Sequence, residues 1–225
     1  MAHFQNDATS PTILTVPGLN NSGPSHWQSL WERSRSDTVR VELGMWDTPH
    51  RNSWVTKLDQ AIRTAQAPVI LVAHSLGCQA VAWWAELSGQ PYGWPVAGAL
   101  LVAPADVDRH DCPESLKGFA PSPMVPLPFP SILVGSHDDP WIELGRARAL
   151  AGQWGSHFVD AGHQGHINAA SGIGDWAEGR GLLERLIDAV GGVRTPAAIR
   201  ADLSMSLAET TVRAGTDSGC APALR

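Results

Sequence analysis

Short apolar runs alternate with longer amphipathic segments along most of this chain, and no other feature constrains its fold as strongly. Each run has the length of a β-strand and most are nearly all apolar, as in strands buried on both faces of a sheet. The expected strands cover residues 13–16, 38–43, 69–73, 96–102, 131–134 and 156–159. The expected helices cover residues 25–34, 52–66, 76–87, 141–154 and 175–190. This alternation predicts an α/β fold, a three-layer sandwich with helices on both faces of a mostly parallel central sheet of about six strands.

The composition limits the classes of function. The 225 residues include 16 Lys and Arg against 22 Asp and Glu, and no basic run appears, so a nucleic-acid partner is not expected. No apolar stretch reaches the roughly 18 residues of a membrane span, and the polar first residues do not resemble a secretory signal. Three widely spaced cysteines indicate free thiols rather than a disulfide framework. We therefore expect a cytoplasmic protein that does not bind membranes.

Composition also divides the chain into segments. We expect a flexible leader over residues 1–11, one domain over residues 12–191 and a mobile polar tail over residues 192–225. Within the domain, residues 104–130 contain seven prolines, which exclude a continuous helix. Irregular segments of this length are typical of lids and binding loops, so we expect a lid-like loop here.

The strongest chemical signal is the sequence Val69-Ile-Leu-Val-Ala-His-Ser-Leu-Gly77. An apolar strand leads into Ala-His-Ser-Leu-Gly and then into a helical pattern, which matches the nucleophile elbow G-x-S-x-G with Ala in the first position. Small residues on either side of Ser75 would let the strand and helix approach closely and present the serine hydroxyl on a tight turn. We predict Ser75 as a nucleophile, with the N–H of Leu76 facing a developing oxyanion.

A serine nucleophile needs a base, and the base needs an orienting acid, which lies between serine and histidine in the chain order of this arrangement. Asp138 and Asp139 follow an expected strand, at the carboxyl end where open α/β sheets place their sites. Asp139 directly precedes Pro140 and fits a turn or helix cap better, so we assign the acid to Asp138. Asp106 is a weaker alternative.

Two Gly-His pairs follow the last expected strand and offer the base, at His163 and His166. The residues alone do not separate these two histidines. Other histidines have weaker claims: His74 lies in the elbow, and His26 lies on a loop that would rim the site.

The loop from Pro17 to Trp27 follows the first expected strand. A second oxyanion donor usually comes from such a loop, here the N–H of Leu19 or Asn20. A phosphate-binding turn is the alternative, but the glycine spacing is not G-x-G-x-x-G and no G-K-[ST] follows. We expect four side chains near this loop and the elbow to contact substrate, namely Asn20, His26, Trp27 and His74.

Several motifs together resemble a known family, the small serine hydrolases of the retinoblastoma-binding protein 9 type within the α/β-hydrolase superfamily, and its bacterial members in particular. The resemblance spans about residues 12–190 and is carried by Val16-Pro-Gly-Leu-Asn-Asn-Ser-Gly-Pro-Ser-His-Trp-Gln28, His74-Ser-Leu-Gly77, Gly135-Ser-His-Asp-Asp-Pro140, Gly165-His-Ile-Asn168 and Ser171-Gly-Ile-Gly-Asp-Trp176. It implies a compact α/β-hydrolase fold without a large cap domain. It also implies a triad of Ser75, Asp138 and His166, because the Gly-His-Ile-Asn motif favours His166 over His163.

We therefore predict a serine hydrolase that cleaves a small carboxylic ester through an acyl-enzyme, with no metal or organic cofactor. An open cleft under one loop would favour short acyl groups of roughly two to six carbons, because it cannot bury a long chain. The alternatives are an amidase or aminopeptidase-like hydrolase on the same triad, and a non-catalytic interaction protein on the same fold. A metallohydrolase built from His137, Asp138, His163 and His166 is a further alternative, but it would leave the elbow unexplained.

Overall fold

The computed structural model describes residues 10–65, 68–191 and 201. Six strands form one sheet in the order β2-β1-β3-β4-β5-β6, and every neighbouring pair is parallel. The strands are β1 (Thr12–Val16), β2 (Thr38–Arg40), β3 (Val69–His74), β4 (Val96–Val102), β5 (Ser131–Gly135) and β6 (His157–Asp160). The expected α/β fold with a central parallel sheet is confirmed.

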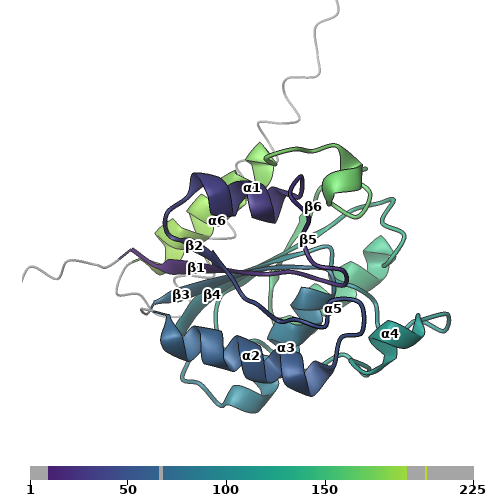
Figure 1. Ribbon diagram of the computed structural model, residues 1–225, viewed down its shortest axis with the longest axis horizontal. Helices are drawn as coiled ribbons and strands as arrows, with labels where there is room; N and C mark the ends of the chain where they lie inside the picture. The colour runs from purple at the N-terminus through teal and green to yellow at the C-terminus, as the bar shows by residue number, and fades with distance from the viewer. Residues whose placement is uncertain (1–9, 66–67, 192–200, 202–225) are drawn as a thin grey trace, which may run out of the picture.

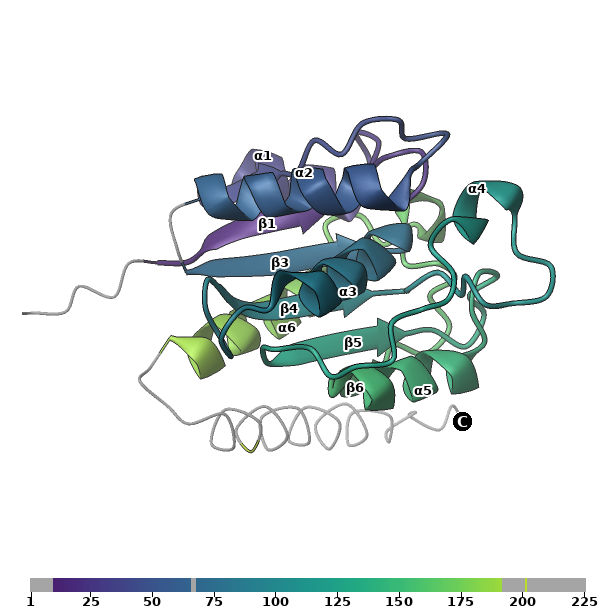
Figure 2. The same cartoon turned by 90° about the horizontal axis from the view of Figure 1, so that it is seen from below.

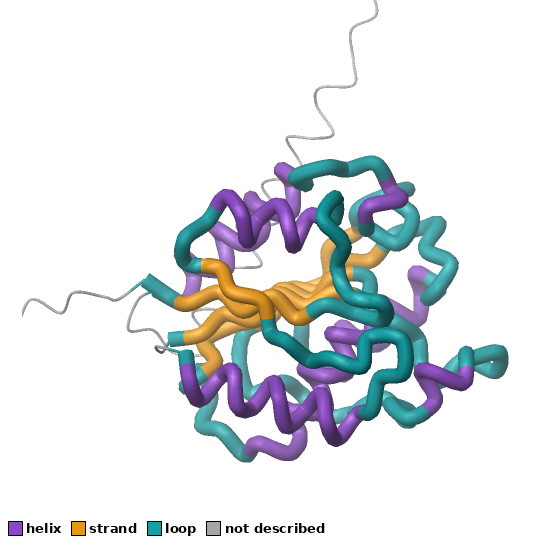
Figure 3. Tube along the Cα trace, viewed as in Figure 1, coloured by secondary structure: helices purple, strands orange, loops and turns teal. Residues whose placement is uncertain are grey.

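Helices cover both faces of the sheet (Figures 1 and 3). They are α1 (Trp27–Ser34), α2 (Arg51–Thr64), α3 (Leu76–Ser88), α4 (Glu114–Lys117), α5 (Leu144–Trp154) and α6 (Ala177–Val190), with a short 3₁₀ helix η1 (Ala169–Ser171). Helices α1 and α6 pack on one face, and α2, α3 and α5 pack on the other. None of the helices within the described ranges is long and apolar enough to cross a membrane.

Alternate strand residues face two separate hydrophobic cores. Leu71 of β3 packs with α2 and α3, whereas its neighbours Ile70 and Val72 pack with α1 and α6. Because both faces are covered, every residue of β3, β4 and β5 is buried, which explains why these strands are nearly continuous apolar runs. The largest fully buried side chains include four tryptophans, namely Trp27, Trp31, Trp54 and Trp154.

The strand order creates a switch point at β1. The chain passes from β1 outward to β2 and then returns to β3 on the other side of β1. Open α/β sheets bind ligands at the carboxyl ends of their strands beside such a reversal. All six strands point toward the same edge, where the loops that follow β1, β3, β5 and β6 gather (Figure 2).

Three helices, α1, α5 and α6, begin two or three residues after the expected positions 25, 141 and 175. Helix α1 is capped by His26, whose Nδ1 accepts the N–H of Gln28 at 3.2 Å. Helix α6 begins after Trp176, and the Asp175 carboxylate pairs with the guanidinium of Arg180 instead of capping the helix.

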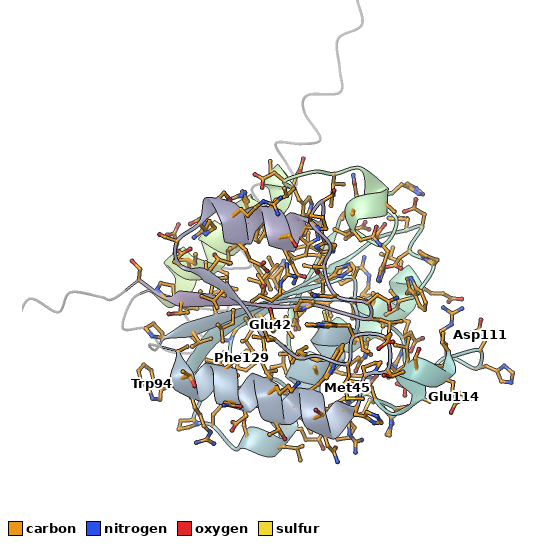
Figure 4. The ribbon with its side chains drawn as sticks, in the orientation of Figure 1. Glu42, Met45, Trp94, Asp111, Glu114 and Phe129 are labelled. Atoms are coloured by element: carbon orange, nitrogen blue, oxygen red, sulfur yellow. The ribbon has the colours of Figure 1, made fainter. Side chains whose placement is uncertain are left out.

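The Pro-rich segment 104–130 is the crossover from β4 to β5, and it takes the place of a crossover helix. Only the four residues of α4 are helical, yet Leu116, Phe119, Leu127 and Phe129 are all buried in the core beside α2 and α3. At its outer end, Asp111 and Glu114 point to solvent (Figure 4). The large apolar residues between the prolines anchor the segment to the domain, and its role as a lid stays a prediction.

The expected leader and tail fall largely outside the described residues. Residues 1–9, 192–200 and 202–225 are not described, so the leader over 1–11 and the tail over 192–225 stay predictions. Within the described part, the domain runs from β1 at Thr12 to the end of α6 at Val190.

Candidate active site

Ser75 occupies the sharp turn between β3 and α3. Its backbone lies at φ 56° and ψ −124°, a conformation that residues other than glycine rarely adopt and that is found mainly at functional sites. Glycine at position 77 lets α3 pass close to β1, because a Cβ there would lie 2.6 Å from the carbonyl oxygen of Pro17. The strand, turn and helix expected around Ser75 are therefore all present.

His166 reaches Ser75 from the loop that follows β6. Its Nε2 lies 2.9 Å from Ser75 Oγ, and both side chains are buried. His163 is exposed instead, and its ring lies 5.0 Å from that of His137 between centroids. The structure thus brings together Ser75 and His166, the pair that the family motif favoured.

The carboxylate beside the imidazole belongs to Asp139. His166 Nδ1 lies 2.8 and 2.9 Å from the two carboxylate oxygens of Asp139, whose side chain is fully buried. Because a carboxylate only accepts, Nδ1 carries the proton and Nε2 is free to accept the hydroxyl proton of Ser75. Ser75, His166 and Asp139 therefore form one continuous chain of hydrogen bonds.

This geometry corrects our assignment of the acid to Asp138. Asp138 accepts hydrogen bonds of 2.8 Å from the Ser136 hydroxyl and from the Gly165 N–H, and it does not contact His166. These two hydrogen bonds lower the pKa of the Asp138 carboxyl. The turn role that we gave to Asp139 is also present, since its Oδ1 accepts the N–H of Trp141 at 2.8 Å. The Asp139 carboxylate therefore both faces the His166 imidazole and accepts a hydrogen bond in the turn, two roles that we had treated as alternatives.

The weaker alternative, Asp106, is also placed away from the imidazole. Its carboxylate lies 3.3 Å from the guanidinium of Arg146, and its backbone N–H donates to the carbonyl of Trp141. Asp106 thereby ties the crossover to the turn that carries Asp139.

Each residue of the Gly165-His-Ile-Asn168 motif has a local structural role. Gly165 has a φ of 51°, which glycine adopts at little cost. Ile167 is fully buried at a φ of 46°, an unusual conformation for a β-branched residue that costs of the order of 1–3 kcal/mol. Asn168 caps η1 by accepting the N–H of Ala170. The turn that carries His166 is therefore a strained backbone held by its surroundings.

The two expected oxyanion donors lie on either side of Ser75. Leu76 is the first residue of α3, so its N–H has no intrahelical acceptor. The β1 loop passes directly over the elbow, because a Cβ added at Gly18 would lie 2.8 Å from Ser75 Cβ and 3.2 Å from Leu76 N. Asn20 donates its N–H to the carbonyl of Trp46, whereas the Leu19 N–H donates to none of the described residues. Of the two alternatives in this loop, Leu19 therefore offers the free donor.

Three of the four residues expected to contact substrate are buried behind Ser75 and His166. Trp27 is fully buried, and His26 and His74 are each only 5% exposed. His26 caps α1, and Trp27 and His74 donate to backbone carbonyls of the loop that carries His166. Only Asn20 is exposed as expected. We therefore correct the expectation for the fully buried Trp27. Substrate contact by His26 and His74 stays a prediction, because Ser75 itself is only 8% exposed.

Burial keeps two of these histidines neutral. It lowers the pKa of His26 to about 4, with smaller contributions from the charges of Arg40 and His166. Burial also holds the pKa of His74 well below its usual value. Near neutral pH, neither ring adds a positive charge beside His166.

The half-buried aromatic residue beside the site is Trp141, one of several tryptophans that the sequence left open between core and cleft wall. The ring of Trp141 lies 6.0 Å from that of His166 between centroids, and the partly buried side chain packs against the hydrophobic core. Leu19 and Trp46 are also half-buried against that core. Its place in the sequence is the signal that links it to the site, because Trp141 follows Asp139 by two residues in the same turn.

The four ligands of the metallohydrolase alternative lie in two separate places. His166 faces Ser75 and Asp139, while His137 faces the carboxylate of Asp160 at 3.0 Å and the ring of His163. Within the described ranges, no group of three or more His, Cys, Asp or Glu residues is arranged to hold a metal ion.

Comparison with known families decides which group of proteins this arrangement belongs to. A family model described as serine hydrolase matches residues 13–185. The chain belongs to the serine hydrolase family. This match does not single out the retinoblastoma-binding protein 9 type, so that narrower affiliation stays a prediction. No curated protein matches this serine hydrolase.

Solved structures support the same family. This serine hydrolase is 34% identical to a hydrolase of Pectobacterium atrosepticum described as YdeN-like, with a TM-score of 0.68 over 81% of this chain and 91% of that chain. The ydeN gene product of Bacillus subtilis has the same fold, with 19% identity and a TM-score of 0.64 over 79% of this chain and 99% of that chain. A monoacylglycerol lipase of Paleococcus ferrophilus also shares the fold, at 13% identity and a TM-score of 0.55 over 80% and 96% of the two chains.

Proposed function

We propose that this serine hydrolase cleaves a small carboxylic ester through an acyl-enzyme on Ser75, with His166 as the base and Asp139 as the orienting acid. The observation that carries the proposal is the continuous hydrogen-bond chain, 2.9 Å from Ser75 Oγ to His166 Nε2 and 2.8 Å from His166 Nδ1 to Asp139. Distances in this range are those expected of a nucleophile, its base and the orienting group.

In the first half of the reaction, Ser75 Oγ attacks the ester carbonyl carbon while His166 Nε2 accepts the hydroxyl proton. The negative charge that develops on the carbonyl oxygen is stabilised by the N–H groups of Leu19 and Leu76. The tetrahedral intermediate then collapses, the bond to the alcohol oxygen breaks, and His166 gives its proton to the departing alkoxide. The acyl group remains esterified to Ser75.

In the second half, a water molecule attacks the acyl carbon and gives a proton to His166. The same two N–H groups stabilise the second oxyanion. Ser75 leaves with the proton from His166, which releases the carboxylic acid and restores the enzyme. Throughout, the buried carboxylate of Asp139 holds the imidazole orientation and stabilises its protonated form.

The substrate class rests on the surroundings of Ser75. The segment between β4 and β5 packs on the domain as a crossover, so within residues 10–65 and 68–191 no large cap domain is inserted between the strands. Leu19, Trp46 and Trp141 supply half-buried apolar surface near the proposed site. This combination favours a small ester with a short acyl group over one with a long chain. An amide on the same triad is the second candidate, and location in the cytoplasm remains a prediction.

A two-part experiment tests the proposal. First, a fluorophosphonate probe is applied to the folded protein and to Ser75→Ala, and we expect labelling of the wild-type protein alone. Second, turnover is measured on chromogenic esters of increasing acyl length beside aminoacyl amides. We expect kcat/KM to be highest for acetyl to hexanoyl esters.

Two histidine variants sharpen the experiment. His166→Ala should reduce turnover nearly as strongly as Ser75→Ala, whereas His163→Ala should retain it, because His163 is exposed and does not contact Ser75. Near wild-type turnover by Ser75→Ala would overturn the role of Ser75 as nucleophile. Absence of both labelling and turnover in the wild-type protein would overturn the proposed function and favour a non-catalytic interaction protein. A clear preference for amides would replace the ester assignment.

A further inference from the structure

We propose that His74 and Trp27 are positioning residues that hold the backbone of the base, and this inference rests on the proposed function of His166. The two side chains bind consecutive carbonyl groups. His74 Nε2 lies 2.9 Å from the carbonyl oxygen of His166, and Trp27 Nε1 donates to the carbonyl of Ile167 at 2.8 Å. Both donors are buried, so water does not replace these hydrogen bonds.

The backbone at this point needs external support. Gly165 and Ile167 lie on either side of His166, and both have positive φ values, 51° and 46°. The conformation at Ile167 is unfavourable for a β-branched residue and persists only where the surroundings determine it. Fixing both carbonyls fixes the planes of the two peptide groups that flank Ile167, and the first of these planes contains the Cα atom from which the His166 side chain leaves the backbone.

His74 also connects the two reacting side chains. It directly precedes Ser75 at the end of β3, so its backbone is continuous with the nucleophile while its ring holds the backbone of the base. A carbonyl oxygen can only accept, so His74 Nε2 carries the proton. The His74 ring packs against those of His166 and His26, at 4.8 and 4.7 Å between centroids. This hydrogen bond therefore sets the position of the base relative to the nucleophile.

Trp27 connects the hydrophobic core under α1 and α6 to the turn that carries His166. Its indole is fully buried, and its ring lies 5.1 Å from that of Trp176 between centroids. One turn later on α1, Trp31 is equally buried and donates its Nε1–H to the carbonyl of Asp175 at 2.7 Å. Trp31 makes the same kind of bond to a carbonyl outside the site, so it provides a matched control.

The first test compares His74→Leu with His74→Gln. Leucine cannot donate, whereas the amide nitrogen of glutamine can stand where Nε2 stands. We expect His74→Leu to lower kcat by roughly 10²-fold with KM little changed, since misplacing a catalytic group by about 1 Å has that effect. His74→Gln should recover most of the lost kcat. Equal impairment of both variants, or unchanged kcat in His74→Leu, would overturn the role of His74.

The second test compares Trp27→Phe with Trp31→Phe. Each variant loses one indole hydrogen bond from a fully buried tryptophan, so we expect similar falls in Tm for the two. Only Trp27→Phe should lower kcat, by about tenfold or more, because only Trp27 holds the turn of the base. Equal kcat losses in the two variants would reduce Trp27 to a purely structural role, and no loss in either would exclude it from positioning.

These outcomes are separable from failure of the proposed function. A wild-type protein that neither hydrolyses esters nor is labelled at Ser75 overturns both proposals. A wild-type protein that is active, together with His74→Leu and Trp27→Phe variants that match it in kcat, overturns the positioning inference alone.

Discussion

Both carboxylate oxygens of Asp139 lie within 2.9 Å of His166 Nδ1, while the neighbouring Asp138 does not contact the imidazole. Adjacent residues in this turn thus divide two tasks. Asp139 faces the base from a fully buried position, and Asp138 holds the turn of the base through the N–H of Gly165. The division gives a direct way to test the proposed acid.

Asp139→Asn should reduce kcat by about 10⁴-fold, the effect of the corresponding change in a serine protease triad, because an amide favours the wrong tautomer of the histidine. Asp138→Asn is the matched control. Its amide oxygen can still accept a hydrogen bond from Gly165, so we expect a loss of less than about tenfold. The measurement is kcat on a chromogenic ester, with unfolding curves for both variants. A larger loss in Asp138→Asn would restore the assignment made from sequence.

The alternation of apolar runs with amphipathic segments was enough to predict the central sheet. A strand buried on both faces is apolar at every position, so β4 was expected at residues 96–102 and is found at Val96–Val102. The choice between Asp138 and Asp139 depends on different information. Both residues lie in the turn that follows β5, and which carboxylate faces His166 depends on how the loops after β5 and β6 fit together.

The environment of His74 and Trp27 was likewise not predictable from local sequence. The motifs placed both residues near Ser75, and the structure does so too. However, the carbonyl that Trp27 binds belongs to Ile167, 140 residues further along the chain. Whether the indole points to the cleft or away from it is decided by packing against α6, and no local pattern around Trp27 reports that packing.

Phe119→Ala should destabilise the protein by about 3–5 kcal/mol, since it removes a fully buried ring from the crossover. Met124→Ala is the control in the same segment, because Met124 is 61% exposed and its truncation should change stability by less than about 0.5 kcal/mol. Urea unfolding at neutral pH measures both. Small effects at both positions would show that the segment is only loosely attached to the domain.

Acid should weaken the fold through the buried histidines. Burial lowers the pKa of His26 from 6.5 to about 4, so the unfolded chain binds more protons than the folded protein between these values. The contribution of His26 is therefore complete above pH 6.5 and is lost as the pH falls toward 4, by about 3 kcal/mol for this shift. The lowered pKa of His74 acts in the same direction.

The measurement is the free energy of unfolding in urea from pH 7 to pH 4.5 for the wild type and His26→Asn. Asparagine is also a favoured helix cap and does not titrate, so this variant should lose less stability across the range. Parallel pH dependence in the two proteins would show that His26 does not titrate with folding.

Gly18→Ala should impair catalysis without removing any functional group. A Cβ at this position would lie 2.8 Å from Ser75 Cβ and 3.0 Å from the carbonyl oxygen of His74. Both atoms belong to the rigid junction of β3 and α3, so the β1 loop must move away and carry the Leu19 N–H with it. Loss of one oxyanion donor costs about 10²–10³-fold in kcat, and we expect a fall toward that range with KM little changed.

Gly23→Ala in the same loop is the control, because a Cβ there meets no atom within 4 Å, and its kcat should match the wild type. Wild-type kcat in Gly18→Ala, with the fold intact, would remove Leu19 from the proposed oxyanion hole.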